Sequence, residues 1–283
     1  MKNIDLHIHT NCSDGLYTTK EVLDLVTERN LNIIAITDHD TLDGYHEAEK
    51  IIHNYDLKII PAVEISTNYK GYDIHILAYN VDPFDKKLNS LLVGIQHGRF
   101  IRAKKIIAKL EDFGINIEFK NVRKITGNRD LIGRPHIARA ILEAGYCQNK
   151  QEVFDKYISN DAPAYVAKPT PSPKKVIKTI KKAGGIPVVA HPFTIRNDAI
   201  IDELVKMGVM GIEVYYAKSS EEMINHYEAF ACERNLIRTG GTDFHGDYYD
   251  LELLGQFTVP EFVLDELETK VNCQTPFLRN RKS

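Results

Sequence analysis

Short apolar runs alternate with amphipathic stretches along most of this chain, and that alternation limits the possible folds more than any other feature. Strand-like runs occupy residues 2–10, 31–40, 57–66 and 72–80, and helix-like stretches occupy 18–30 and 43–55. The pattern resumes after residue 173, with further strand-like runs at 186–192, 210–216 and 237–246. The sequence therefore predicts an α/β fold, in which functional groups gather at the carboxyl ends of the strands.

The middle of the chain has a different character. Residues 98–114 and 133–145 have helical patterns, and no strand with a polar end separates them. The segment 165–173 contains three prolines and is typical of an irregular linker. We therefore expect an α/β core built from residues 1–95 and 166–283, interrupted by a helical insertion over 96–165.

The first strand-like run contains two histidines, His7 and His9, in the sequence DLHIHTNCSDG. In an extended segment, residues two apart point to the same face, so both imidazoles lie on one side. On this motif alone, a pair of surface histidines on an edge strand and a metal site are equally good interpretations. The other histidines and acids of the chain have to decide between them.

Eleven histidines are present, and six of them fall in or at the ends of the predicted strands. Three acids occupy comparable places. Imidazole is the commonest metal ligand, and nine candidate ligands are more than one ion needs. The candidate ligands are His7, His9, Asp14, His39, Glu64, His75, His191, Asp243 and His245.

This nitrogen and oxygen donor set, which lacks thiolates, favours two or three divalent ions, with Mn²⁺ first and Fe²⁺ or Zn²⁺ as alternatives. Neighbouring Asp5, Asp38 and Asp40 are expected to hold imidazole tautomers. Ordinary surface or half-buried roles are expected for His46, His53, His97 and His226, which lie in helical stretches.

Composition excludes several other classes of protein. The four cysteines form no CxxC pair, which disfavours a disulfide framework and a zinc–thiolate site and suits a reducing cytoplasm. A net charge of −3 gives no global basic field for long nucleic acid. No apolar run reaches the ~18–20 residues needed to span a membrane, and no secretory signal is expected. No feature identifies a protein partner.

The ordered motifs DLHIHTNCSDG, ITDHDT, PAVEIS, DIHILAY, VVAHP, GIEVYY and GTDFHG resemble those of the PHP (polymerase and histidinol phosphatase) family. The resemblance implies a distorted (β/α)7 barrel with a trinuclear metal centre. It assigns the ligands of three ions by position. One ion would take His7, His9, Glu64 and Asp243, the second would take Glu64, His75 and His191, and the third would take Asp14, His39 and His245.

A centre of this kind favours hydrolysis of phosphate esters by a metal-bound hydroxide, without a protein nucleophile. Arg134, at a helix start with Pro135, is the first candidate for gripping a phosphate. Lys168 is a second candidate, and His136 is a possible general acid. Tyr215 and Tyr216 could stack on a base or pack in the core.

The helical insertion, expected to act as a substrate cap, resembles the branch of 3',5'-nucleotide bisphosphate phosphatases and 5'-to-3' exoribonucleases. The leading prediction is therefore a phosphoesterase for nucleotides such as pAp or for short 5'-phosphorylated oligoribonucleotides. A phosphatase for histidinol phosphate or another small metabolite is an alternative. A non-catalytic binding module stabilised by metal is the alternative from another class.

Overall fold

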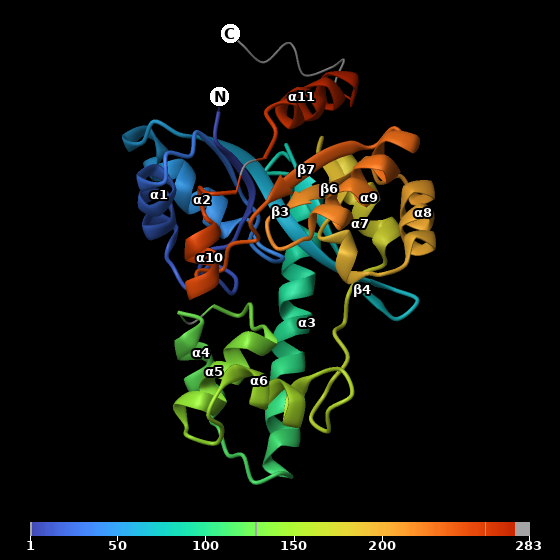
Figure 1. Cartoon of the computed structure of the whole chain (residues 1–283). Helices are drawn as coiled ribbons and strands as arrows, with labels where there is room; N and C mark the ends of the chain where they lie inside the picture. The colour runs from blue at the N-terminus through green and yellow to red at the C-terminus, as the bar shows by residue number, and fades with distance from the viewer. Residues whose placement is uncertain (1, 128, 258, 275–283) are drawn as a thin grey trace.

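The structure is a computed structural model, and it describes residues 2–127, 129–257 and 259–274; of residues 270–274 it describes the backbone. Seven strands form one sheet in the order β1 to β7 (Figure 1). The strands are β1 Ile4–Ile8, β2 Ile33–Ile36, β3 Lys58–Tyr69, β4 Tyr72–Tyr79, β5 Ile186–Val189, β6 Gly211–Tyr216 and β7 Ile237–Gly241.

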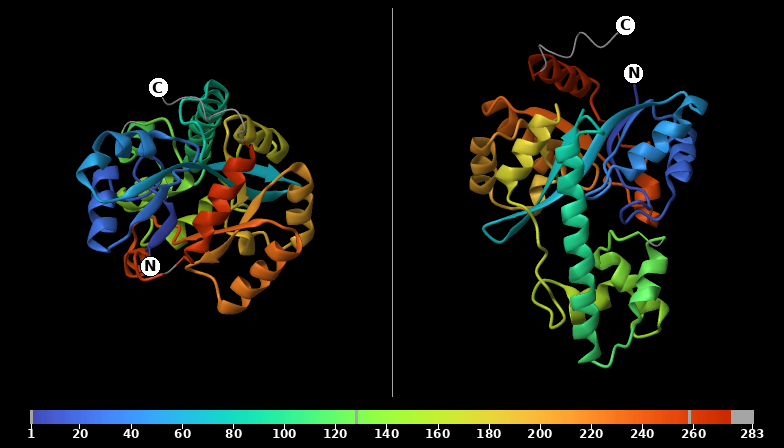
Figure 2. Two further views of the ribbon diagram at one scale, coloured as in Figure 1. Left: turned by 90° about the horizontal axis from the view of Figure 1, so that it is seen from above. Right: turned by 180° about the vertical axis from the view of Figure 1, so that it is seen from behind.

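The sheet curls into a nearly closed barrel, as the view from above shows (Figure 2). Strand β4 runs antiparallel to both of its neighbours, and all other adjacent pairs are parallel. Beyond β7 the chain meets β1, because His9 N–H donates to the Phe244 carbonyl and Phe244 N–H donates to the His7 carbonyl. The predicted distorted barrel of seven strands is confirmed.

Eleven α-helices are present in the described part of the chain, together with three helical turns of other types. The helices are α1 Thr19–Glu28, α2 Asp43–Ile51, α3 Lys86–Glu111, α4 Phe119–Ile125, α5 Arg134–Glu143, α6 Lys150–Val153, α7 Pro173–Lys182, α8 Asp198–Met207, α9 Glu221–Glu233, α10 Tyr248–Leu253 and α11 Phe262–Gln274. The turns are η1 Ile52–Asn54, η2 Phe154–Ile158 and η3 Pro192–Thr194. None of the described helices combines the length and apolarity needed to cross a membrane.

Local chemistry explains where several elements begin and turn. Thr18 and Glu21 form the capping box that begins α1, with Thr18 N–H 2.7 Å from the Glu21 carboxylate. Strands β3 and β4 form a hairpin through Lys70 and Gly71, whose φ angles of 52° and 88° suit a tight two-residue turn. The hairpin explains why β4 reverses direction within an otherwise parallel barrel.

The 26-residue helix α3 leaves the barrel and supports a separate group of helices, which we call the cap (residues 96–165; Figures 1 and 2). Its buried face continues at spacings of three and four residues along its whole length. Leu88 to Ile95 pack in the barrel core, and Ala103 to Leu110 pack in a second core within the cap. The expected boundary at residue 96 thus lies inside one continuous helix.

Candidate metal centre and active site

Glu64, on β3, lies at the centre of the predicted ligands and is fully buried. Its Oε1 is 3.0 Å from His75 Nδ1 and 3.0 Å from His191 Nε2. Its Oε2 is 2.9 Å from His39 Nδ1. One carboxylate therefore faces imidazoles that follow β2 and β5 or lie on β4, which suits a bridging position between ions.

His7 and His9 point into the same space, as their i, i+2 spacing on β1 predicts. The Nε2 atoms of both rings lie 3.3–3.4 Å from Glu64 Oε2 and 3.1–3.3 Å from Asp243 Oδ1. These four side chains offer ligand atoms that all lie within 4.8 Å of one another. This group matches the first predicted ligand set.

Asp14 and His245 form the outer part of the cluster. His245 Nε2 is 3.4 Å from Asp14 Oδ1, and His39 Nε2 is 3.9 Å from Asp14 Oδ2. His9 joins these three residues in a second group of ligand atoms that lie within 4.8 Å of one another. A third such group contains His39, Glu64 and His75. The structure thus brings all nine predicted residues together, and we call them the histidine–carboxylate cluster.

Several buried atoms of this cluster have no hydrogen-bond partner among the described residues. They include His7 Nε2, both ring nitrogens of His9, Asp14 Oδ1, Glu64 Oε2 and His75 Nε2. Burying a polar atom without a hydrogen-bond partner costs free energy. A group of such atoms in one place therefore indicates a binding site for a cation. The donor set fits divalent ions that accept imidazole and carboxylate ligands.

The electrostatics of the cluster agree with metal binding. Burial alone would raise the pKa of Glu64, but the positive charges of His39, His75 and His7 outweigh it and hold this pKa well below its usual range. Burial, reinforced by His245, lowers the pKa of His9 to about 3. Burial opposes a charge on His7, His39, His191 and His245, but the nearby carboxylates outweigh it and raise the pKa of these imidazoles, to about 10 for His245. Since imidazole binds metal in its neutral form, metal binding at these four residues would displace protons.

Glu213, on β6, is a functional residue that the sequence analysis missed. Its Oε1 is 2.8 Å from His7 Nδ1, and its Oε2 accepts from the backbone N–H of His191. It is 1% exposed and therefore orients two of the predicted ligands, His7 and His191, from inside the barrel wall. A lone acid in the apolar run GIEVYY was the available signal. Asp250 was also missed; it accepts from the backbone N–H groups of His245 and Gly246.

The prediction that Asp5, Asp38 and Asp40 hold imidazole tautomers is wrong. Asp5 accepts from Thr242 and from the backbone of His7, and Asp38 accepts from Thr10 and Ser13. Asp40 pairs with Arg99. These carboxylates fix the loops that carry the predicted ligands, because their hydrogen-bond partners are backbone amides, hydroxyls and, for Asp40, the Arg99 guanidinium rather than imidazole nitrogens.

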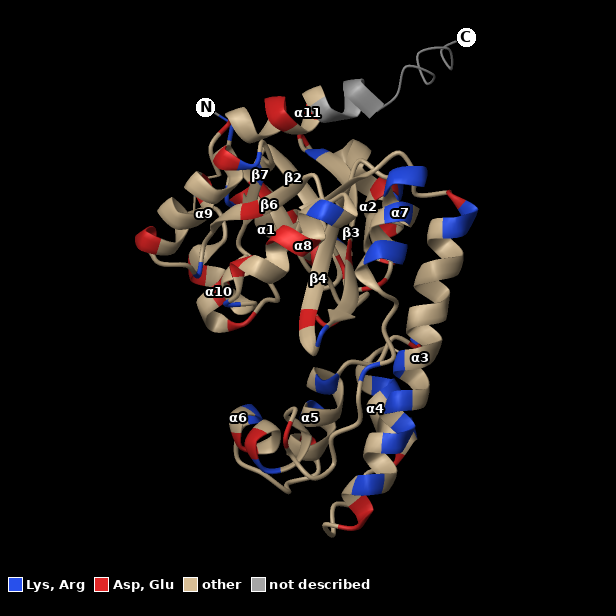
Figure 3. Cartoon of the chain, turned by 90° about the vertical axis from the view of Figure 1, so that its right-hand side faces the viewer, with Lys and Arg blue, Asp and Glu red and all other residues tan. Residues whose placement is uncertain are grey.

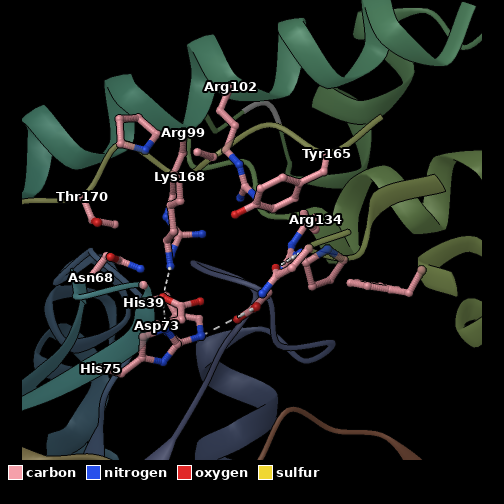
Figure 4. Close-up of a pocket in the computed structure, with 17 residues that line it drawn as sticks. His39, Asn68, Asp73, His75, Arg99, Arg102, Arg134, Tyr165, Lys168 and Thr170 are labelled. Carbon is pink, nitrogen blue, oxygen red and sulfur yellow. Dashed lines mark hydrogen bonds and ion pairs between the residues drawn. The ribbon is translucent and has the colours of Figure 1, made fainter. Parts of the chain in front are cut away.

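A cavity of about 540 Å³ opens between the cluster and the cap, and we call it the cap pocket (Figure 4). Its floor includes Asp14, His39 and His75 of the cluster. Its cap side carries four basic residues, Arg99, Arg102, Arg134 and Lys168. The predicted substrate residues Arg134 and Lys168 therefore line the same cavity as the cluster.

Arg99 and Arg102 were missed by the sequence analysis. Both are 6% exposed and occupy positions of the buried face of α3, between the barrel core and the cap core. Arginines that interrupt an apolar helical stripe were the signal that could have identified them. Arg99 is neutralised by Asp40, with Nε 2.7 Å from Oδ2, whereas Arg102 Nε donates to the Val166 carbonyl.

Arg102, Arg134 and Tyr165 form the far end of the cap pocket. The guanidinium of Arg102 lies 5.8 Å from the centre of the Tyr165 ring, and that of Arg134 lies 5.9 Å from it. Arg134 donates to the Ile158 carbonyl and to Asn160 Oδ1. Neither arginine pairs with a carboxylate within the described residues. The carboxylate of Asp73 lines the same cavity and offsets part of this charge. The four basic residues of the lining still outnumber its two acids, Asp14 and Asp73, which makes the cavity suited to an anion.

Lys168 and His136 differ in their relation to the cap pocket. Lys168 Nζ donates to Ser66 Oγ at 2.6 Å, and burial together with Arg99 lowers its pKa to about 8. His136 lies in the first turn of α5, where its Nδ1 accepts from Gly133 N–H. His136 is not among the residues that line the cap pocket.

Of the two tyrosines that were candidates for base stacking, Tyr215 packs in the barrel core and bonds Glu228, which excludes stacking on a substrate. Tyr216 donates to Asp243 Oδ2 at 3.0 Å and contacts the ring of Phe193. The remaining histidines are exposed or half-buried, as expected: His46, His53, His97 and His226. Cys12, Cys147 and Cys232 are free thiols.

A barrel that presents six imidazoles and three carboxylates beside a basic pocket defines a metal-dependent hydrolase of anionic esters. A family model described as the PHP domain matches residues 5–159, and the chain belongs to this family. The 3',5'-nucleoside bisphosphate phosphatase of Chromobacterium violaceum is 32% identical over 252 residues, which cover 87% of this chain and 88% of that protein.

A 5'-3' exoribonuclease of Haemophilus influenzae is 30% identical over 249 residues, covering 86% of this chain and 90% of the relative. Among solved structures, a Bifidobacterium adolescentis protein provisionally assigned as a metal-dependent phosphoesterase superposes with a TM-score of 0.85 and 28% identity, covering 98% of both chains. The protein is therefore a metal-dependent phosphoesterase of the PHP family.

Proposed function

We propose that this phosphoesterase acts on nucleotides that carry a second phosphate, either 3',5'-nucleoside bisphosphates such as pAp or short 5'-phosphorylated oligoribonucleotides. The observation that carries this proposal is the pair of guanidinium groups, Arg102 and Arg134, that line the same cavity as the histidine–carboxylate cluster and form no ion pair within the described residues. One phosphate would react at the cluster while the other is held in the cap. The names of the two relatives above support this substrate class.

The charge of the cap also supports an anionic substrate. Residues 96–165 contain thirteen Lys and Arg against eight Asp and Glu, in a chain whose net charge is −3 (Figure 3). The positive charge is therefore concentrated on the part of the molecule that faces the cluster across the cap pocket. A local field of this kind raises the concentration of anions near the site.

We infer that the cluster holds two or three divalent ions, preferably Mn²⁺. The ligands would be His7, His9, Glu64 and Asp243 for one ion, Glu64, His75 and His191 for another, and Asp14, His39 and His245 for a third. Such ions, when bound, lower the pKa of a coordinated water and neutralise charge on a phosphoryl group.

The residues of the chain would perform the remaining tasks. Arg102 and Arg134 would bind and orient the non-reacting phosphate, and Lys168 Nζ would contact the substrate from the side of the cavity. His136 stays a proposal for the general acid. Its Nδ1 accepts from Gly133, so Nε2 carries the proton, and the ring also bonds the Ser13 backbone in the loop that holds Asp14.

The test is release of phosphate and nucleotide from pAp, a 5'-phosphorylated triadenylate and histidinol phosphate, measured side by side with Mn²⁺. The same assays are run with Arg134→Ala and with Arg139→Ala, an exposed residue of α5 that serves as control. Comparison of the two variants distinguishes loss of a contact in the cap pocket from loss of one positive charge anywhere on α5. We expect pAp or the triadenylate to have the highest kcat/KM and Arg134→Ala to lower it by about 10–100-fold.

Two outcomes would contradict the proposal. A far higher kcat/KM for histidinol phosphate would support the small-metabolite alternative. Normal Mn²⁺ content without hydrolysis of any of the three esters would support a non-catalytic binding module.

A further inference from the structure

A second groove, of about 670 Å³, lies at the same end of the barrel as the histidine–carboxylate cluster. It is formed by η3, the beginning of α8 and the beginning of α9, and we call it the downstream groove. Its lining combines apolar surface from Phe193, Met223 and Tyr227 with the positive charge of Arg196. Neither the cap pocket nor the predicted ligands include any of these residues.

The groove begins one aromatic ring away from the cluster. The centre of the Phe193 ring is 6.3 Å from that of His191 and 4.6 Å from that of Tyr216. The Tyr216 hydroxyl in turn donates to Asp243 Oδ2 at 3.0 Å. A group that leaves the cluster beside His191 and Asp243 therefore meets the Phe193 side of the groove next.

The cap pocket opens on other residues of the cluster, namely Asp14, His39 and His75. If the 5'-phosphate of a strand is held by Arg102 and Arg134, its next phosphate reaches the cluster, as in the proposed function. The nucleotide after that phosphate cannot return into the occupied cap pocket. We take it to leave past His191, because His191 lies outside the cap pocket and its ring adjoins Phe193 of the downstream groove.

The chemistry of the groove suits one nucleotide. Met223 is 37% exposed and Phe193 is half-buried, so together they offer an apolar surface on which any base can stack. Arg196 is exposed and forms no ion pair among the described residues, which leaves its charge for a phosphate. The nearby carboxylate of Asp198 lies 2.8 Å from His226 Nε2, and Glu222 is the other acid of the lining.

We propose that the downstream groove binds the nucleotide that follows the scissile phosphate, with its base on Phe193 and Met223 and its own 3'-phosphate near Arg196. This inference rests on the proposed function and deepens it. It assigns to this protein a site that pAp cannot fill and that an oligonucleotide can. The site would make short single-stranded RNA ends, rather than mononucleotides, the substrates that use the whole binding surface.

The experiment compares pAp with 5'-phosphorylated triadenylate on the Mn²⁺-loaded full chain. Arg196→Asn removes the charge and suits the φ of 53° at this position, because asparagine tolerates the left-handed region. Met223→Ala removes the apolar surface. Lys206→Asn, an exposed residue in the last turn of α8, removes the same charge far from the groove and serves as control.

We expect Arg196→Asn and Met223→Ala each to lower kcat/KM for the triadenylate by roughly tenfold, mainly through KM, and to leave pAp hydrolysis within about twofold. Arg196→Asn should also reduce the slope of log(kcat/KM) against log(salt) by about 0.7, the value for one single-strand phosphate contact. Lys206→Asn should leave kcat/KM unchanged for both substrates. Fluorescence anisotropy of a 3'-labelled 5'-phosphorylated triadenylate, with metal-free protein, gives a readout that is independent of turnover.

The possible failures are distinguishable. If the wild type hydrolyses neither substrate, the proposed function fails. If pAp is hydrolysed but triadenylate turnover and binding do not respond to either variant, or the triadenylate is not bound, the downstream groove is overturned and the proposed function stands. An equal fall in kcat/KM for pAp and the triadenylate would also contradict the proposed role of the downstream groove, because it would show that the substitution disturbs the histidine–carboxylate cluster.

Discussion

His7 and Glu213 lie 2.8 Å apart, Nδ1 to Oε1, inside a barrel wall where neither side chain reaches solvent. Because Nδ1 faces this carboxylate, Nε2 is the nitrogen that faces Glu64 and Asp243. Glu213 is thus a positioning residue for the proposed metal ligand His7, and through its second oxygen it also holds the backbone of His191.

We expect Glu213→Gln to weaken Mn²⁺ binding by about 10–100-fold while the barrel stays folded, since the amide preserves shape but loses charge. Isothermal titration with Mn²⁺ measures the change. Glu228→Gln, which removes the carboxylate that bonds Tyr215 on the outer side of β6, is the control. An unchanged Kd in Glu213→Gln would show that Glu213 does not act on the ligands.

Replacing Arg102 should affect substrates according to their number of phosphates. We expect Arg102→Met to lower kcat/KM for pAp by about 10–100-fold, because a charge-assisted contact to the second phosphate is lost. Hydrolysis of p-nitrophenyl phosphate, which has one phosphate, should change little. Lys105→Met, an exposed residue of the same helix, is the control. Equal losses on both substrates would contradict a role at the second phosphate.

Lys168 should make substrate binding sensitive to alkaline pH. Burial, followed by the charge of Arg99, lowers the pKa of Lys168 to about 8, so its ammonium is charged below this pH and neutral above it. We therefore expect KM for pAp to rise as pH increases through about 8, with kcat less affected. Initial-rate profiles from pH 6.5 to 9.5 measure this limb. The same rise of KM with pH in Lys168→Gln would show that another group is responsible for it.

The pair of Arg99 and Asp40 should contribute to stability rather than to substrate binding alone. Asp40 is fully buried and Arg99 is 6% exposed, so Arg99→Met would leave a buried carboxylate without its partner. We expect a loss of about 3 kcal/mol in the free energy of unfolding, measured by urea denaturation. Arg102→Met, one turn further along α3, should cost less because no carboxylate depends on Arg102. A loss below about 1 kcal/mol for Arg99→Met would contradict this account.

The α/β alternation and the nine cluster residues could be predicted from the sequence, because strand spacing places His7 and His9 on one face and His191 follows a strand; the barrel itself was implied by the family resemblance. Glu64 was expected at the end of its strand but lies in the middle of β3. The antiparallel direction of β4 was not predicted, since the Lys70–Gly71 turn was not recognised as a hairpin. Asp38 and Asp40 were misassigned because adjacency to His39 in the sequence says nothing about where alternating side chains point.

The cap side of the site was harder to predict. Arg102 and Tyr165 are 63 residues apart, and they meet only because the cap folds back along α3. Glu213 has no distinguishing sequence context, and its contact with His7 forms only when the folded barrel brings β1 and β6 together. Residues that act through tertiary contacts of this kind have no local sequence signature.

Helix α3 belongs to the barrel core at one end and to the cap core at the other, without interruption. The separation between the two phosphate-recognising ends of the cap pocket is therefore set by the rise of an α-helix, about 1.5 Å per residue, and not by a hinge. Substrates would be selected by the spacing of their charges against a rigid reference. Because each added residue also rotates the helix by about 100°, only insertion of nearly whole turns between Arg99 and Arg102 would keep the cap facing the cluster and change the preferred substrate length.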